Sequence, residues 1–160
     1  MQKRTRYGQN VTNLLKISVI MTLGGLYMLK KQFNYKYFNR NEFADKISGA
    51  NKISPKLIKM LDKAREIAGV PFIINSGYRD ENHPESLSNP TSSHIKGLAV
   101  DIAVNPSNRE IIKQALIKVG FTRFGFGSNF IHVDIDYSKT QKVAWYYDGR
   151  ATQYNYSEVV

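Results

Sequence analysis

The chain has 160 residues, of which 42% are hydrophobic and 12% aromatic, which suits one ordinary domain and excludes a disordered chain. It has no cysteine, so a disulfide framework, a thiolate nucleophile and a cysteine-ligated zinc site are excluded. The net charge is +10, but residues 1–41 hold eight basic residues and no acidic one. Because the rest of the chain is close to neutral, the charge distribution argues against a nucleic-acid binder.

A basic and hydrophobic segment, residues 1–31, begins the chain. Within it, residues 14–29 carry a single charge, that of Lys16. About 20 apolar residues are needed to span a bilayer, so this run is short for a transmembrane helix. We consider three interpretations: an uncleaved signal anchor that associates with a membrane, a helix that docks on the protein body or a partner, and a cleaved signal peptide.

Residues 32–150 have the pattern of one α+β domain, and a polar tail, residues 151–160, follows it. Two helices are predicted, each with capping residues before an apolar stripe and a glycine after it. They begin at Ser54-Pro55 and at the capping box Ser107–Glu110, and they end at Gly69 and Gly120.

Short apolar runs bounded by turn residues predict five strands. They lie at residues 71–75, 98–104, 121–126, 130–136 and 142–147. The last three strands follow one another with tight turns between them. We therefore expect a small antiparallel sheet with the helices packed on one side.

Two of the three histidines stand in patterns that are typical of metal ligands. His94 precedes Asp101 by seven residues, and this carboxylate lies in an apolar strand, where burial is costly unless a cation neutralises it. Alternation along residues 130–136 places His132 and Asp134 on the face opposite the apolar side chains. His94, Asp101 and His132 thus supply three ligands for one Zn²⁺ ion, with a fourth position open for water, as in catalytic sites. From the residues alone, ordinary polar positions without a metal are an equal alternative.

The order and spacing of these motifs resemble the zinc D-Ala-D-Ala carboxypeptidase family. This family includes the L-alanyl-D-glutamate endopeptidases of phage endolysins and shares its fold with the hedgehog signalling domain. The resemblance covers residues 38–147, and three motifs carry it: Ser76-Gly77-Tyr78-Arg79, His94-x-x-Gly97-x-Ala99-x-Asp101, and Gly125-x-Gly127 leading into His132-Val133-Asp134. It implies that His94, Asp101 and His132 hold one Zn²⁺ ion and that the substrates are stem peptides of peptidoglycan.

The resemblance also implies residues that bind substrate. Arg79 is expected to contact the carbonyl or carboxylate of the peptide, to which its fork of donors is suited. Ser76 and Tyr78 would help to position the peptide, although Tyr78 has core packing as an alternative. His83, in the loop after Arg79, is a further candidate contact. The aromatic residues 145–147 would line the cleft, with core packing for at least one of them.

The general base is less well defined by the sequence. Several relatives place an acidic residue three positions before the last zinc histidine, but here that position is Asn129, which cannot titrate. Asp134 is the candidate base, and orienting a zinc histidine is an equal alternative role for it. His83 and Glu81 are further candidates.

The expected function is that of a zinc-dependent peptidase that hydrolyses peptide bonds in peptidoglycan stem peptides. A place in the cell envelope or on the periplasmic side of the membrane is expected, and a phage endolysin or virion-associated protein is one such case. The alternatives are a non-catalytic zinc-binding domain and a structural component of a virion or envelope. The motifs do not define which bond is cleaved.

Overall fold

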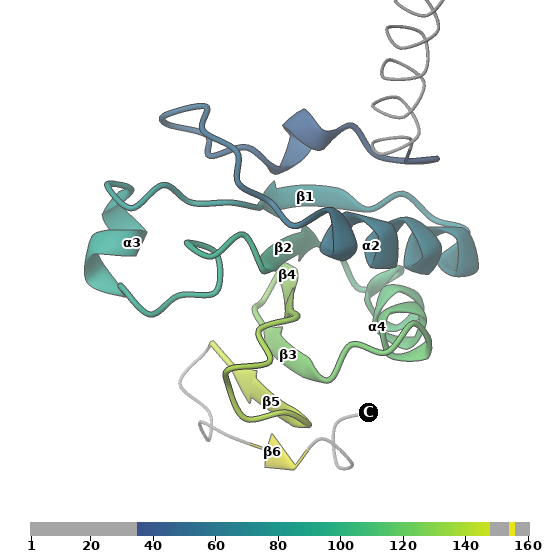
Figure 1. Ribbon diagram of the computed structural model, residues 1–160. Helices are drawn as coiled ribbons and strands as arrows, with labels where there is room; N and C mark the ends of the chain where they lie inside the picture. The colour runs from purple at the N-terminus through teal and green to yellow at the C-terminus, as the bar shows by residue number, and fades with distance from the viewer. Residues whose placement is uncertain (1–34, 148–153, 156–160) are drawn as a thin grey trace, which may run out of the picture. The chain divides into compact units, whose positions relative to one another are not determined.

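The computed structural model describes residues 35–147 and 154–155 (Figure 1). These residues belong to the second of two compact units, which begins at Tyr35. The predicted N-terminal segment, residues 1–31, lies outside them, as does most of the predicted tail. Among the described residues, no helix is both long enough and apolar enough to cross a membrane.

The described helices are a 3₁₀ helix and three α-helices. Their bounds are η1 Arg40–Phe43, α2 Pro55–Ala68, α3 Pro84–Ser88 and α4 Arg109–Lys118. The prediction for α2 is confirmed, with Ser54 before its first residue and Gly69 in the left-handed conformation after its last. The capping box predicted for α4 is wrong, because Asn108 is the N-cap and the Ser107 hydroxyl donates to the Asn105 side chain instead.

The strands form one mixed sheet of six strands in the order β1-β2-β4-β3-β5-β6. Their bounds are β1 Ile73–Ser76, β2 Ala99–Ala103, β3 Arg123–Phe126, β4 Phe130–Asp134, β5 Val143–Tyr146 and β6 Tyr154–Asn155. The α+β class is confirmed. The prediction of an entirely antiparallel sheet is wrong in one respect, since β5 pairs in parallel with β3.

The parallel pairing follows from the segment that leaves β4. Instead of turning back beside β4, residues 135–142 carry the chain past β3 to its free edge. The Gln141 side-chain amide donates to the carbonyls of Asp136 and Lys139 and so holds this connection in a compact turn. A hairpin therefore does not form between β4 and β5, although the connection is short enough for one.

The main core lies between one face of the sheet and the helices α2 and α4, which lie beside each other (Figure 1). Leu61 of α2 and Leu116 of α4 belong to the same fully buried cluster as Ile102 and Ile131 of the sheet. Each such side chain contributes roughly 1.5–3 kcal/mol of stability by its burial. The alternation predicted for β4 is confirmed, because Ile131 faces this core while His132 belongs to the opposite face.

The loop that leads into β2 lies against the segment that leads into α2. Gly97 has φ 68°, a left-handed conformation, and its carbonyl accepts a hydrogen bond from the Ser54 amide. A side chain at position 97 would overlap with the carbonyl oxygen of Lys52. Gly97 therefore permits both the turn and the close approach that hold this loop in place.

A comparison of two glycines tests this role. We expect Gly97→Ala to lower the free energy of unfolding by about 3 kcal/mol or more, because it adds a backbone overlap to the strain of a left-handed residue. Gly69→Ala is the matched control, since Gly69 has φ 66° but open space around it, and its expected cost is about 1 kcal/mol. Urea unfolding measures both values, and equal losses would contradict the crowding at Gly97.

Candidate metal centre

The candidate site is built on one row of residues that crosses four strands. Asp101 of β2 lies directly opposite His132 of β4, and His132 lies opposite Gly125 of β3. Gly125 in turn lies beside Trp145 of β5. A side chain at Gly125 would overlap with the Trp145 ring, so the glycine lets this ring lie within 5.4 Å of the His132 ring, between centroids. The sheet register therefore places a carboxylate, an imidazole and an aromatic wall side by side.

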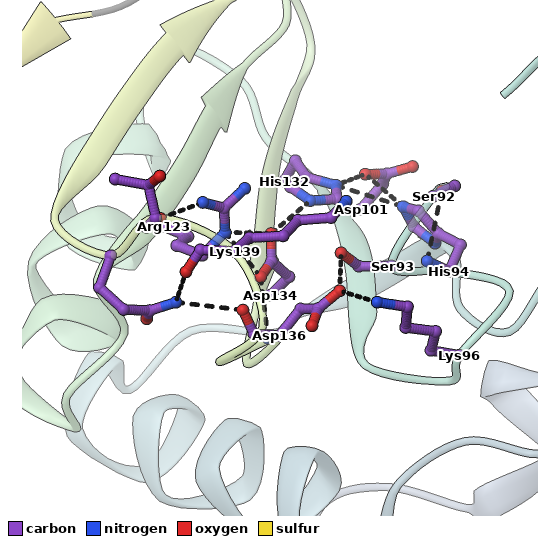
Figure 2. Close-up of polar contacts among 12 residues, drawn as sticks. Ser92, Ser93, His94, Lys96, Asp101, Arg123, His132, Asp134, Asp136 and Lys139 are labelled. Atoms are coloured by element: carbon purple, nitrogen blue, oxygen red, sulfur yellow. Dashed lines mark hydrogen bonds and ion pairs between the residues drawn. The ribbon is translucent and has the colours of Figure 1, made fainter. Parts of the chain in front are cut away.

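Three potential ligand atoms converge at this row (Figure 2). His132 Nδ1 lies 2.8 Å from Asp101 Oδ1 and 3.2 Å from His94 Nε2, and His94 Nε2 lies 3.4 Å from Asp101 Oδ1. Around a tetrahedral zinc with bonds of about 2.0–2.1 Å, neighbouring ligand atoms lie roughly 3.3–3.4 Å apart. The donor set of two imidazoles and one carboxylate therefore fits one ion with only small adjustments.

His94 is held by a backbone carbonyl from the loop after β1. Its Nδ1 lies 2.6 Å from the Gly77 carbonyl oxygen, which can only accept a hydrogen bond. Nδ1 must therefore carry the proton, and Nε2 presents a lone pair toward His132 and Asp101. Position 77 requires a glycine, because the carbonyl oxygen of Phe43 lies 2.5 Å from where a Cβ would be.

Asp101 has its two carboxylate oxygens engaged differently. Oδ1 faces the histidines, while Oδ2 accepts a hydrogen bond of 2.8 Å from Arg79 Nη2. Arg79 also donates to the Ser76 hydroxyl and forms an ion pair of 2.8 Å with Glu85. The guanidinium thus orients the ligand carboxylate, and since it has five donors, these three contacts leave others for a substrate oxygen.

His132 has a second carboxylate on the far edge of its ring. Its Nε2 lies 3.4 Å from Asp134 Oδ2, so Asp134 accepts the proton of that nitrogen while Nδ1 faces the other ligands. Asp134 is 2% exposed, and Arg123 Nε donates to both of its oxygens at 2.9 and 3.0 Å. This buried ion pair fixes the Asp134 side chain and, through it, the orientation of His132.

The pKa shifts of the three residues favour a neutral His94, an ionised Asp101 and positive charge at His132. Burial lowers the pKa of His94, which favours the neutral ring that a metal requires. Burial alone would raise the pKa of Asp101, but the hydrogen bonds and charges of His132 and His94 outweigh it and hold that pKa well below its usual range. Burial would lower the pKa of His132, but Asp101 and Asp134 outweigh it and raise that pKa, because the two carboxylates favour positive charge at this ring. A metal ion that binds there would have to displace the proton from Nδ1.

Comparison with known families agrees with this geometry. A family model described as Peptidase M15 matches residues 31–134, which is more than half of the chain. The chain belongs to the Peptidase M15 family. The members of this family are zinc-dependent metallopeptidases, and the resemblance drawn from the three sequence motifs is confirmed. A comparison with curated proteins finds no match.

The candidate metal centre of this M15 peptidase lies in an open cleft with a volume of about 600 Å³. One wall is polar and comes from α3 and the loop after it, with Glu85, Ser88 and Asn89. The other wall is aromatic and consists of Phe130, Trp145 and Tyr147. An elongated, partly apolar chain with polar groups is the kind of ligand that such walls can contact.

The residues predicted to bind substrate have different surroundings. Arg79 lines the cleft, and Ser76 holds Arg79 from behind through its hydroxyl. Tyr78 is 2% exposed and packs in the core, which is the alternative considered for it. His83 is the N-cap of α3, where its Nδ1 accepts a hydrogen bond from the Glu85 amide. Of residues 145–147, the first and last line the cleft, while Tyr146 packs on the core.

Four charged or aromatic side chains that no sequence motif identified also line the cleft. They are Glu85, Arg123, Phe130 and Lys139. Arg123 and Phe130 become part of the site through strand pairing, Lys139 through the turn of residues 135–142, and Glu85 through the position of α3, where it pairs with Arg79. Asn129 and Glu81 are exposed and belong to other surfaces.

A buried carboxylate behind the metal centre anchors the His94 loop. Asp136 is 1% exposed and accepts hydrogen bonds from the hydroxyls of Ser93 and Ser138 and from the Lys96 ammonium. Figure 2 shows it between the end of β4 and the loop that carries His94. Asp136 thereby connects the two segments that supply the histidine ligands.

We expect Asp136→Asn to lower the free energy of unfolding by about 2 kcal/mol near pH 7, because it removes charge-assisted hydrogen bonds. Burial would raise the pKa of Asp136, but its hydrogen bonds from Ser138, Lys96 and Ser93 outweigh this effect and lower it. A lowered folded-state pKa contributes stability above the unfolded value of about 4, and this contribution is lost as pH falls toward the folded value. The difference between parent and variant should therefore narrow in urea unfolding at about pH 3. A difference that does not change with pH would show that the Asp136 charge contributes nothing.

Proposed function

We propose that the protein is a zinc-dependent peptidase that hydrolyses peptide bonds in the stem peptides of peptidoglycan. The observation that carries the proposal is the convergence of His94 Nε2, Asp101 Oδ1 and His132 Nδ1 within 3.4 Å of one another in an open cleft. A structural zinc site would be enclosed by four protein ligands. Membership of the M15 family supports the same conclusion.

Each part of the site has a role in this reaction. Zinc, when bound, supplies a Lewis acid that polarises the carbonyl and makes water more acidic. Arg79 binds a substrate oxygen with the donors that its contacts to Asp101 and Glu85 leave available. The aromatic wall of Trp145 and Tyr147 holds the peptide across the centre and keeps water away from it.

Hydrolysis also needs a group that takes a proton from water and passes it to the leaving amine. Of the two roles considered for Asp134, orienting His132 fits its contacts better, since Arg123 occupies both of its oxygens and its side chain is 1% exposed. Glu85 is the other carboxylate of the cleft that is not a candidate ligand, and its side chain is 62% exposed. We propose Glu85 as the proton carrier.

The activity itself can be tested with defined muropeptides. The zinc-loaded protein should release a peptide fragment that mass spectrometry identifies, and a chelator should stop the release. The mass of the product also shows which bond is cut. If zinc binds at one ion per chain through His94, Asp101 and His132 but no muropeptide is cleaved, the alternative of a non-catalytic zinc domain is correct, and the amide at Asn129 is the feature that favours it.

Two isosteric substitutions separate the roles of the cleft carboxylates. Asp134→Asn should weaken zinc binding by about 10- to 100-fold, because the group that orients His132 loses its charge. Glu85→Gln should leave zinc affinity unchanged and reduce kcat by roughly a hundredfold or more at saturating zinc. Competition with a chromogenic chelator measures the affinity, and single-substrate kinetics measure kcat. A normal kcat in Glu85→Gln together with a lost kcat in zinc-saturated Asp134→Asn would assign the base to Asp134 instead.

We further propose that the protein acts at the cell envelope, where its substrate lies. The basic and apolar segment at residues 1–31 supports this location, because such a segment suits export or attachment to a membrane. Fractionation of cells that produce the full chain tests it. Copurification with phage particles would instead support a virion component.

A further inference from the structure

One cation of the cleft, Lys139, has no role in the metal centre described above. It lines the cleft together with Asp101 and His132, and Figure 2 shows its side chain extending toward these two residues. Lys139 is half-buried and lies beyond residue 134, where the match to the family model ends.

The two arginines that line the cleft with Lys139 each form ion pairs with carboxylates. Arg79 pairs with Asp101 and Glu85, and Arg123 pairs with Asp134. Within residues 35–147, the Lys139 ammonium has neither an ion pair nor a hydrogen bond. A half-buried ammonium is a compact positive charge with three hydrogen-bond donors. An anion that enters the cleft can therefore form both an ion pair and hydrogen bonds with it.

The backbone that carries Lys139 is held firmly. Its amide donates to the Asp136 carbonyl, and its carbonyl accepts from the Gln141 side chain. The next residue is held as well, because Arg123 Nη1 donates to the Thr140 carbonyl. A lysine mounted on a fixed turn and directed into a cleft is suited to selecting a ligand, since the ligand does not have to order the backbone.

The chemistry of stem peptides indicates which anion it would meet. In a D-Ala-D-Ala terminus, the carbon that bears the leaving amine also bears a free carboxylate. The same is true of an L-Ala-D-Glu bond, because D-Glu continues through its γ-carboxyl group and keeps its α-carboxylate. We propose that Lys139 binds the free α-carboxylate of the substrate residue whose amine is the leaving group, an inference that rests on the proposed function. The site would therefore select peptides with a carboxylate next to the scissile bond.

Trp145 provides a readout of binding that does not depend on turnover. It is the only tryptophan of the chain and lies in the cleft wall, so its fluorescence should respond to an occupied cleft. The full-length protein, held in chelator to stop hydrolysis, is titrated with acetyl-D-Ala-D-Ala and its C-terminal amide, and with the γ-amide of L-Ala-D-Glu and the corresponding α,γ-diamide. The peptide pair for which the acid binds better identifies the source of the carboxylate.

We expect the parent to bind the acid of one pair about tenfold more tightly than the amide, as for a hydrogen-bonded charge pair. Lys139→Gln should bind acid and amide alike, and Lys139→Arg should keep part of the preference. Lys59→Gln is the matched control, since it removes the same charge from an exposed position on α2 outside the cleft, and it should behave as the parent.

The proposal is overturned if acid and amide bind the parent alike or not at all, or if Lys139→Gln keeps the preference. These outcomes are distinct from a failure of the proposed function. Zinc-dependent cleavage of muropeptides without a preference that depends on Lys139 would refute only the role of Lys139. A preference that depends on Lys139 in a protein that cleaves nothing would refute only the peptidase activity.

Discussion

The burial of the Asp101 carboxylate in the middle of β2 is the constraint on which the rest of the site depends. An ionised carboxylate in an apolar strand is costly unless positive charge and hydrogen-bond donors surround it. Here the strand register provides His132 opposite it, the loop before β2 provides His94, and the turn after β1 provides Arg79. Arg79 donates a hydrogen bond to Asp101 Oδ2, and Asp101 Oδ1 faces the two histidines. A cation bound between Asp101, His94 and His132 would complete the neutralisation of the carboxylate. The candidate metal centre and the local stability of the sheet therefore arise from one electrostatic requirement.

The sequence was sufficient for the parts of this arrangement that have a local pattern. The alternation along β4 placed His132 and Asp134 on the face away from the core, and the caps of α2 defined its ends. The position of His94 was harder to predict from the sequence, because His94 lies in a turn and not on a strand with a regular alternation. Gly77 and Gly97 were visible in the motifs, but the close backbone contacts that require them, with Phe43 and Lys52, join segments far apart in the chain.

The features that could not be predicted depend on which strands become neighbours. A short connection after β4 is compatible with a hairpin, and only the packing of residues 135–142 directs β5 to the far edge of β3. That choice brings Trp145 beside Gly125. The pairing of β3 with β4 brings Arg123 to Asp134. The role of Asp134 could not be decided from the sequence for the same reason, because it depends on an arginine that reaches it from another strand.

The candidate metal ligands and part of the cleft lining come from different parts of the chain. The three candidate ligands and Arg79 all lie within residues 31–134, the part that matches the family model. Trp145 and Tyr147 of the aromatic wall, and Lys139, come from the segment that follows. Ligand geometry tolerates little change, whereas the lining of a cleft can vary without loss of the ion. The segment after residue 134 would therefore contribute to the selection of one peptide bond over another, together with Phe130 and the polar wall from α3, and its parallel placement against β3 brings it to the candidate metal centre.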